Sequence, residues 1–318
     1  MIRSACLIFN PVAGQGDSEQ DLKTIRSLLE TEIKLDIRFT SKEIGAEQLA
    51  KDAIQQGVEA VIVSGGDGTI SAVVAALVGT KVPLGVISRG TANAFAHALN
   101  IPNTIQGACE TILTGYTRVV DAAICNGKPM MLMAGVGFEA EAIEQADRRA
   151  KDRLGVFAYI WGAVRQLKKI RQFQSKIETE DRIIRVPAAA VTVANAAAYT
   201  SIFAQGPTEV VADDGLLDVT IVASPTIPGV VITSYALLRS ALGGYPIDRK
   251  EVGYLRAKYV RVETDPPQKV VVDGEIIGTT PIEMECIPKG IEVFIPEWEK
   301  RPVENLNELP GVEIKMKN

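Results

Sequence analysis

Histidine is nearly absent from this sequence of 318 residues, because His97 is the only one. A Ser-His-Asp triad, or a metal site built from several histidines, would have to use that single residue. His97 lies in the segment 94–99, whose composition favours a helix, and we interpret it as a packed or surface residue of that helix. Serine hydrolases and multi-histidine zinc enzymes are therefore disfavoured.

Cysteine is also scarce, and the sequence has no excess of positive charge. The four cysteines are scattered and form no C-x-x-C pair, so neither a zinc ribbon nor a disulfide framework is indicated. Reduced thiols in a cytosol fit this pattern best. The net charge of −5 gives no overall basic field, and we therefore expect no nucleic-acid partner.

Long hydrophobic runs are missing as well. The apolar run at 5–9 ends at Asn10-Pro11 and is too short for a signal-peptide core. The longest uncharged stretch, 219–238, contains two prolines, which indicates a buried strand, turn and helix rather than a membrane span. We expect a cytoplasmic protein that associates only transiently with the membrane surface if its substrate is a lipid.

The first third of the chain alternates predicted strands and helices. Strands are expected at 5–10, 33–39, 58–64 and 83–87, and helices at a segment capped by Ser18, at 44–56, at 69–78 and before Pro102. Such a series predicts a parallel sheet with right-handed crossovers. We therefore expect an α/β, Rossmann-like nucleotide-binding domain over residues 1–122.

From about residue 118 the pattern becomes strand-rich. Asn126-Gly127 predicts a type I′ hairpin, and residues 141–173 are expected to be helical. Further strands are expected at 183–194, 258–264, 269–273, 282–286 and 291–295. Residues 123–297 are therefore predicted to form a β-rich sandwich domain with a helical insertion, and residues 298–318 a tail that docks on the first domain.

The segment 65–69, Gly-Gly-Asp-Gly-Thr, lies between a predicted apolar strand and a helix start. Glycines at such a turn let main-chain N–H groups approach a phosphate, and the helix N-terminus adds partial positive charge. Asp67 is unusual there, because a carboxylate repels a phosphate unless a cation or a proton transfer intervenes. The segment therefore favours metal-assisted phosphoryl transfer, although an ordinary tight turn is the alternative.

Several segments in one order resemble a known family. The segment 65–69 resembles the nucleotide motif shared by diacylglycerol, sphingosine and NAD kinases. The further matching segments are Asn10-Pro11-x-x-Gly14, Gly90-Thr91-Ala92-Asn93-x-Phe95-Ala96, Gly135-Val136-Gly137-Phe138, Asp213–Asp218 and Asp273-Gly274-Glu275. Together they resemble the diacylglycerol kinase catalytic-domain family, and most closely its bacterial soluble lipid kinases of the YegS/BmrU type. That resemblance implies a lipid kinase that uses ATP and Mg²⁺ in phospholipid metabolism.

The resemblance also implies roles for particular residues. The ATP contacts it implies are Asn10, Gly14, Thr40, Gly65, Gly66, Gly68, Thr69, Gly90 and Thr91. The metal ligands it implies are the Asp214 carboxylate and the carbonyls of Val211 and Leu216, and oxygen ligands of this kind suit Mg²⁺. Glu275 is implied as the general base for the lipid hydroxyl and Asp67 as part of the catalytic network. Secondary candidates are Asn93, Asp121 and Asp273.

Simpler interpretations and one departure stand beside these roles. Asp213-Asp214-Gly215 is also compatible with a surface turn, and Asp273-Gly274 with a hairpin turn. Glu139 stands where the family usually has Asp after its G-x-G-F motif, which leaves any role that needs close geometry there unassigned.

The membrane contact expected from the sequence is a basic segment. Residues 147–185 contain eleven Lys or Arg and five Asp or Glu, and Arg165, Lys168, Lys169 and Arg171 lie close together beside aromatic residues. Such a segment favours contact with anionic lipid headgroups, and a solvated helix face is the alternative.

Two other functions are considered, an NAD kinase and a catalytically silent nucleotide- or lipid-binding regulator. A homodimer is possible, and the sequence does not select among diacylglycerol and related lipids.

Overall fold

The computed structural model describes residues 2–14, 16–137, 172–197, 210, 212–223 and 251–297. Several expectations fall elsewhere in the chain. The helix expected at 141–173, the basic cluster at 165–171 and the tail after residue 297 lie outside the described residues, and so do Val211 and Glu139.

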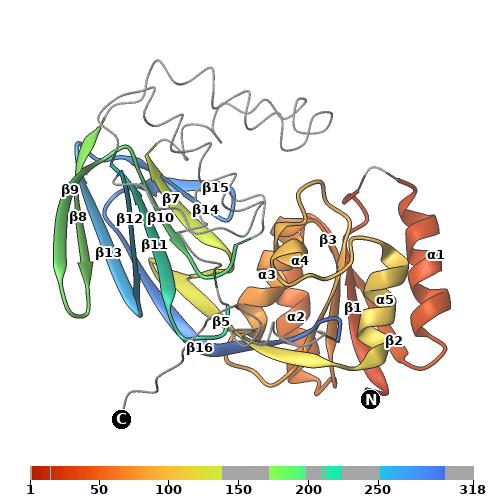
Figure 1. The fold of residues 1–318 in the computed structure, drawn as a ribbon. Coiled ribbons are helices and arrows are strands. Elements are labelled where there is room, and N and C mark those ends of the chain that lie inside the picture. Colours follow the sequence, from red (N-terminus) through yellow and green to blue (C-terminus); the bar gives the residue numbers. More distant parts are fainter. Residues whose placement is uncertain are drawn as a thin grey trace, which may run out of the picture.

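Helices alternate with parallel strands in the N-terminal domain (Figure 1). Its elements are β1 (Ser4–Phe9), α1 (Ser18–Leu29), β2 (Lys34–Phe39), α2 (Ala46–Gln55), β3 (Val61–Gly65), α3 (Asp67–Leu77), β4 (Leu84–Ser88), α4 (Ala94–Ala98) and α5 (Ile105–Thr114). The strands lie in the order β2-β1-β3-β4, and every neighbouring pair is parallel. The predicted α/β domain with a parallel sheet is therefore confirmed.

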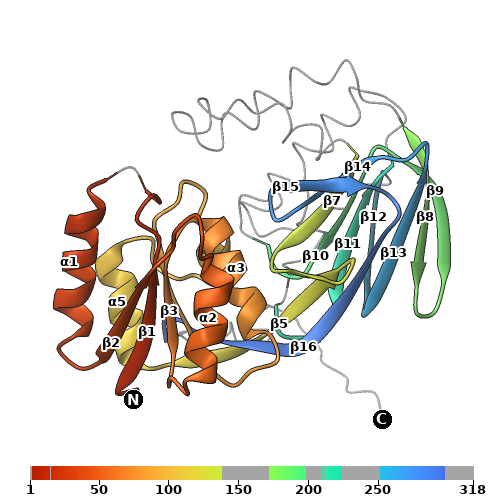
Figure 2. The same cartoon turned by 180° about the vertical axis from the view of Figure 1, so that it is seen from behind.

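The two faces of this sheet are covered by different helices, as the front and back views show (Figures 1 and 2). Leu7 and Phe9 of β1 pack with residues of α1 and α5, whereas Cys6 and Ile8 pack with residues of α2 and α3. Successive side chains of a strand point to opposite faces, so a strand covered on both faces must be apolar throughout. This requirement explains the continuous apolar runs of the sequence.

The C-terminal domain consists of two packed sheets. Its elements are β5 (Thr117–Cys125), β6 (Lys128–Met130), β7 (Met133–Gly137), β8 (Phe173–Thr179), β9 (Ile183–Ala188), β10 (Ala190–Ala194), β11 (Leu217–Val222), β12 (Val252–Ala257), β13 (Tyr259–Asp265), β14 (Lys269–Val272), β15 (Glu275–Thr279) and β16 (Ile282–Phe294). One sheet is antiparallel, in the order β12-β11-β10-β7-β14-β15. Its inner face packs on β8, β13 and β16 around a shared apolar core, which confirms a β-rich second domain.

The strand β16 joins the two domains, and Figure 1 shows it running from one to the other. It pairs with β13 and β5 in antiparallel fashion and with β4 in parallel, through Val293 and Leu84. One sheet therefore extends in the order β2-β1-β3-β4-β16-β13-β8-β9 through both domains. Because β5 spans Thr117–Cys125, the expected boundary between residues 122 and 123 falls inside a strand of that sheet.

Several local predictions differ from the structure. The N-cap of α1 is Asp17 rather than Ser18, because the Asp17 carboxylate accepts hydrogen bonds from the N–H groups of Glu19 and Gln20. The segment 183–194 forms two strands, β9 and β10, whereas 282–286 and 291–295 belong to the single strand β16, whose register shifts between Ile287 and Ile291. The Asn126-Gly127 hairpin is confirmed, with φ of 47° and 77°.

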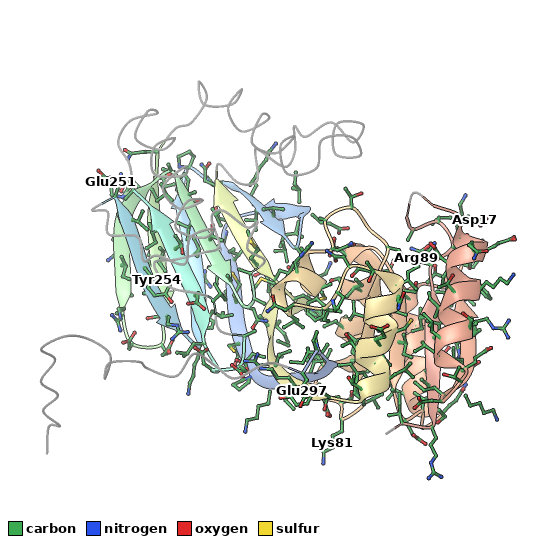
Figure 3. The ribbon with its side chains drawn as sticks, turned by 45° about the vertical axis from the view of Figure 1, so that its right-hand side comes forward. Asp17, Lys81, Arg89, Glu251, Tyr254 and Glu297 are labelled. Atoms are coloured by element: carbon green, nitrogen blue, oxygen red, sulfur yellow. The ribbon has the colours of Figure 1, made fainter. Side chains whose placement is uncertain are left out.

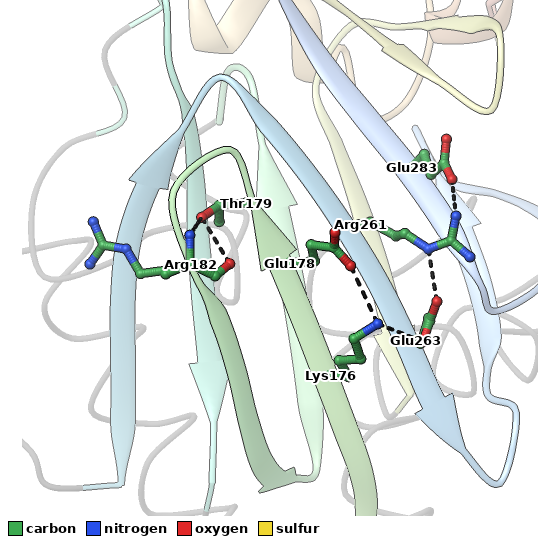
Figure 4. Close-up of polar contacts among 7 residues, drawn as sticks. All are labelled: Lys176, Glu178, Thr179, Arg182, Arg261, Glu263 and Glu283. Carbon is green, nitrogen blue, oxygen red and sulfur yellow. Dashed lines mark hydrogen bonds and ion pairs between the residues drawn. The ribbon is translucent and has the colours of Figure 1, made fainter.

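The solvent face of β8, β13 and β16 carries a row of ion pairs (Figure 4). Lys176 contacts Glu178 and Glu263, each at 3.3 Å, and Arg261 binds Glu263 at 2.8 Å and also Glu283. Exposed pairs of this kind contribute at most about 1 kcal/mol each, so this face is a solvated surface.

Within the part of the chain that the structure describes, no helix has the length and hydropathy needed to cross a membrane.

The junction of the domains has no room for a side chain at Gly290. A Cβ atom there would lie 2.6 Å from the Ala122 Cβ and 2.9 Å from the Ala122 nitrogen. We expect Gly290→Ala to lower the free energy of unfolding by about 1–3 kcal/mol, the usual cost of overpacking. Gly16→Ala is the control, because a Cβ at Gly16 would meet nothing within 4 Å. Equal urea midpoints for the two variants would contradict this close packing.

Candidate functional site

Three loops follow β1, β3 and β4 at the carboxyl ends of these parallel strands (Figure 1). The described parts of these loops include residues 10–14, the turn 65–67 and the segment 89–93. Loops at this edge of an open α/β sheet lie side by side and form the usual ligand site of such folds. The expected ATP contacts Asn10, Gly65 and Gly90 belong to these three loops.

Helix α3 begins directly at the glycine turn, two residues earlier than predicted. Gly66 is its N-cap, with φ −89° and ψ 178°, and no side chain caps it. A Cβ at Gly65 would lie 2.7 Å from the Thr69 Cβ, so this position requires glycine. A helix N-terminus without a side-chain cap offers N–H groups and partial positive charge to an anion.

The turns after β3 and β4 touch through their main chains. A Cβ at Gly90 would lie 2.9 Å from the Gly66 Cα and 3.0 Å from Asn93 Oδ1. The N–H of Arg89 donates to the Gly65 carbonyl at 2.7 Å. These contacts fix the two turns as one surface, in which Gly68 and Thr91 are exposed.

The loop after β1 is joined to the same surface by Asn10. Its Nδ2 donates to Thr69 Oγ1 at 2.8 Å, and its Oδ1 accepts from the Val12 N–H at 3.1 Å. Gly14 has φ 91° and its missing Cβ would lie 3.2 Å from the Arg89 carbonyl, which requires glycine. Thr40 follows β2 and donates its N–H to the Phe9 carbonyl at 3.0 Å, which places it beside the start of this loop.

Asp67 lies at the first position of α3 and is partly buried. Its Oδ1 accepts a hydrogen bond from the Ala94 N–H at 2.8 Å, at the start of α4. The residue before, Asn93, has φ 47° and is buried. One Asp67 oxygen therefore holds the β4 loop in place, and the other accepts no hydrogen bond from the described residues.

Buried polar atoms without hydrogen-bond partners gather around these turns. In the described part of the chain they include Ser64 Oγ, Ser88 Oγ, Asn93 Oδ1 and Arg89 Nη2. A buried polar group without a partner costs about 1–3 kcal/mol, and such groups often mark a place where a ligand or ordered water completes the structure. This pattern fits a site for a polar ligand.

The turn between β14 and β15 brings a second carboxylate to the first. Asp273 has φ 48° and Gly274 has φ 86°, so the predicted hairpin turn is confirmed. Burial raises the pKa of the Asp273 carboxyl, three backbone N–H groups lower it, and the charge of Asp67 raises it further. Met131 and Leu132, whose N–H groups donate to Asp273, belong to the same apolar cluster as Ile70 of α3 and Phe95 of α4, so Asp67 and Asp273 lie on elements that pack together.

The Asp273 carboxylate is fully used in hydrogen bonds to the segment that connects β6 to β7. Its Oδ2 accepts from the Met131 N–H at 2.7 Å, and its Oδ1 accepts from the N–H groups of Leu132 and Met133 at 2.8 and 3.0 Å. Glu275 lies two residues further on, in the exposed strand β15. Two extended residues span at most about 7 Å, so Glu275 lies near the same region with a solvent-exposed carboxylate.

Asp121 and Asp214 lie away from the Asp67 turn. Asp121 accepts from the N–H groups of Gly215 at 2.6 Å and Lys289 at 2.8 Å, and the neighbouring Gly290 carbonyl accepts from Gly79, just after the end of α3. Asp67 begins that helix of 11 residues, which is roughly 15 Å long. The secondary candidate Asp121 therefore anchors the turn 212–216, toward the end of α3 opposite to Asp67.

The Asp214 carboxylate forms an ion pair with Arg256 and accepts from the Leu216 N–H at 3.1 Å. Asp213 pairs with Arg118 at 2.6 Å. Across the described residues, no three His, Cys, Asp or Glu side chains group as a metal cage. Because the neighbouring Gly215 donates its N–H to Asp121, the turn that carries Asp214 lies with Asp121 rather than with Asp67.

The sequence analysis missed Arg89 and Asp21. Arg89 is 6% exposed and its Nε donates to Asp21 Oδ2 at 2.8 Å. The available signal was a charged residue directly after the apolar strand β4 and directly before Gly90, where a buried position was expected.

Comparison with known proteins extends over almost the whole chain. The sequence model of the diacylglycerol kinase catalytic domain matches residues 4–125, and that of the YegS C-terminal NAD kinase beta sandwich-like domain matches residues 133–295. An uncharacterised protein of Synechocystis sp. is 49% identical over 302 residues, 91% of this chain and 70% of that protein. A diacylglycerol kinase of Bacillus subtilis is 26% identical over 93% of this chain and 97% of its own length.

A crystal structure of a diacylglycerol kinase from Bacillus anthracis shares this fold. Its TM-score is 0.72 at 24% identity, over 92% of this chain and 97% of that one. The arrangement of an α/β domain followed by a β-rich domain is therefore common to both proteins.

The Asp273 contacts generate a stability prediction. Asp273→Asn replaces one acceptor oxygen with an NH₂ group that faces a backbone N–H, and we expect it to lower the free energy of unfolding by about 1–3 kcal/mol. Glu275→Gln, two residues away and exposed, should change it by less than about 0.5 kcal/mol. Urea unfolding measures both, and equal effects would show that Asp273 does not hold the connecting segment.

Proposed function

This chain belongs to the diacylglycerol kinase catalytic-domain family, with a C-terminal domain of the YegS type, and we propose that it transfers the γ-phosphate of ATP to a lipid hydroxyl. Diacylglycerol, or a related glycerolipid, is the proposed acceptor, which would give phosphatidic acid or a similar product. The supporting observation is that Asp67, at a glycine-rich helix N-terminus, and Asp273, from the second domain, lie on elements that pack together.

The proposed nucleotide position follows from the three loops. Main-chain N–H groups at the start of α3 would bind phosphate oxygens, and the exposed Gly68 has no side chain to obstruct their approach. Phosphoryl transfer depends mostly on positioning and on charge stabilisation. A rigid pair of turns is therefore the kind of surface that such a reaction needs.

Asp67 has the donor set for a magnesium ion. Its Oδ1 is committed to the Ala94 N–H, which orients the carboxylate, and its second oxygen is available. Mg²⁺ in kinases typically takes one or two carboxylates together with substrate phosphates and water, so the residues present fit it. When bound, Mg²⁺ supplies positive charge against the developing phosphate charge.

Glu275 is a better candidate for the general base than Asp273. A base must have a lone pair free to accept the proton of the lipid hydroxyl. Both oxygens of Asp273 already accept backbone hydrogen bonds, whereas Glu275 is exposed. In the proposed step Glu275 takes the hydroxyl proton while that oxygen attacks the γ-phosphorus and the bond from phosphorus to the β-bridging oxygen breaks.

The function is tested with labelled ATP, Mg²⁺ and two acceptors side by side, diacylglycerol in mixed micelles and NAD. We expect a labelled, organic-soluble phospholipid. A labelled dinucleotide would instead identify an NAD kinase, and no labelled product from these acceptors or from a total lipid extract would favour a silent regulator.

Asp67→Asn isolates the charge of Asp67 in that assay. The variant keeps an oxygen that accepts from the Ala94 N–H but loses the carboxylate charge, so we expect it to fold and to lose activity about 100-fold or more. Asp67→Ala removes both features and should also lower the melting temperature. Wild-type turnover in Asp67→Asn would refute the catalytic role.

We also propose that the chain meets its lipid at a membrane surface, from a cytoplasmic location, through the basic segment around 165–171. Each basic residue near an anionic bilayer contributes about 1 kcal/mol. Reversal of Lys168 and Lys169 to Glu should therefore weaken pelleting with phosphatidylserine-containing vesicles by about tenfold or more. Reversal of Lys23 and Lys34, exposed residues of the N-terminal domain, changes the net charge equally and should not; equal losses in both would exclude a specific contact.

A further inference from the structure

Arg89 is a buried cation beneath the loops of the proposed nucleotide site. Its side chain is 3% exposed and comes from the segment that follows β4. Figure 3 shows Arg89 next to α1, at the end of the sheet where the loops gather. A buried charge is costly unless it is paired and hydrogen-bonded, so the partners of this guanidinium indicate why it is there.

Each partner of the Arg89 side chain lies in a different element. Nη1 donates to the Asn10 carbonyl at 3.0 Å, and Nε donates to Asp21 of α1 at 2.8 Å. The guanidinium also stacks over the Phe9 ring, 4.4 Å from its centroid. The planar fork of arginine therefore ties α1 to the main chain at the start of the β1 loop.

The main chain of Arg89 completes the connection. Its N–H donates to the Gly65 carbonyl at 2.7 Å, and its carbonyl lies 3.2 Å from where a Gly14 Cβ would be. Nη2 has no hydrogen-bond partner among the described residues and lies 3.7 Å from that same Cβ position. Arg89 thus contacts both ends of the loop 10–14 and the turn after β3.

We propose that Arg89 is a positioning residue that sets the geometry of the loop 10–14 for ATP, acting through the Asn10 carbonyl. The inference rests on the proposed function, because it assigns this loop to the nucleotide. Because Arg89 is buried, it acts on the nucleotide indirectly. It follows that its loss affects the ATP side of the reaction and leaves the lipid side unchanged.

Arg89→Lys is the main test. A lysine keeps the positive charge but has no planar fork, so it can serve Asp21 or the Asn10 carbonyl and not both in the same geometry. We expect the KM for ATP to rise about tenfold, the effect of losing one charge-assisted hydrogen bond. The kcat and the KM for lipid should stay within about twofold of the wild type, because binding is weakened equally in the ground and transition states.

Two further variants separate positioning from stability. Asp21→Asn keeps an acceptor for Nε but removes the paired charge, so it should raise the KM for ATP by a smaller factor. Asp17→Ala removes the N-cap of α1 without a contact to Arg89, so it should lower the melting temperature while leaving the KM for ATP unchanged. If Arg89→Lys fails to fold, Asp21→Asn carries the test.

The outcomes distinguish this inference from the proposed function. Titration calorimetry with MgATP measures nucleotide affinity without any lipid. Wild-type binding of MgATP with no phosphorylation of any lipid would overturn the proposed function and leave the inference open to measurement by affinity. An unchanged ATP affinity in Arg89→Lys and Asp21→Asn, or an equal rise in Asp17→Ala, would overturn the inference.

Discussion

The contact between Gly66 and Gly90 is the constraint on which the rest of the site depends. Two neighbouring parallel strands end side by side, and their turns meet with no side chain between them. Since a Cβ at Gly90 would come within 2.9 Å of the Gly66 Cα, any larger residue would separate the loops. That contact sets where α3 begins, where Asp67 points and how the Ala94 N–H reaches it, so loop geometry and carboxylate position are fixed together.

The site places carboxylates beside the proposed phosphate-binding turn, and the fold explains how the two can lie together. Asp67 stands at the N-terminus of α3, where the helix dipole favours negative charge. Asp273 is held by three backbone N–H groups. Each carboxylate is thus stabilised by main-chain donors, and the negative charge of Asp67 would attract the metal ion that we propose. The second acidic group, around Asp214 and Asp218, is neutralised by Arg256 instead.

Local patterns in the sequence predicted the α/β domain, because strands buried on two faces must be apolar and the glycines of 65–69 mark a turn. They also located the hairpin at Asp273-Gly274, where positive φ restricts the residue type. Such patterns do not report how residues far apart in the sequence are arranged in space. Asp121 and Asp214 share a charge type with Asp67, yet the length of α3 separates them, and no local pattern reports that distance. The register shift in β16 likewise explains why one strand was predicted as two.

Arg89 was missed for a related reason. A single arginine has no periodicity, and its role depends on contacts with distant residues. Asp21 lies 68 residues away in the sequence and Asn10 lies 79 residues away. The energetic cost of burying the Arg89 guanidinium indicates that this side chain does more than stabilise the fold. A leucine could fill the same space on Phe9 without the cost of desolvating a charge, so stability alone gives no reason for a guanidinium. What leucine could not do is donate to the Asn10 carbonyl and to Asp21 at once. A buried ion pair of this kind specifies geometry more than it adds stability, and here the geometry it specifies is that of the loop over the glycine turn.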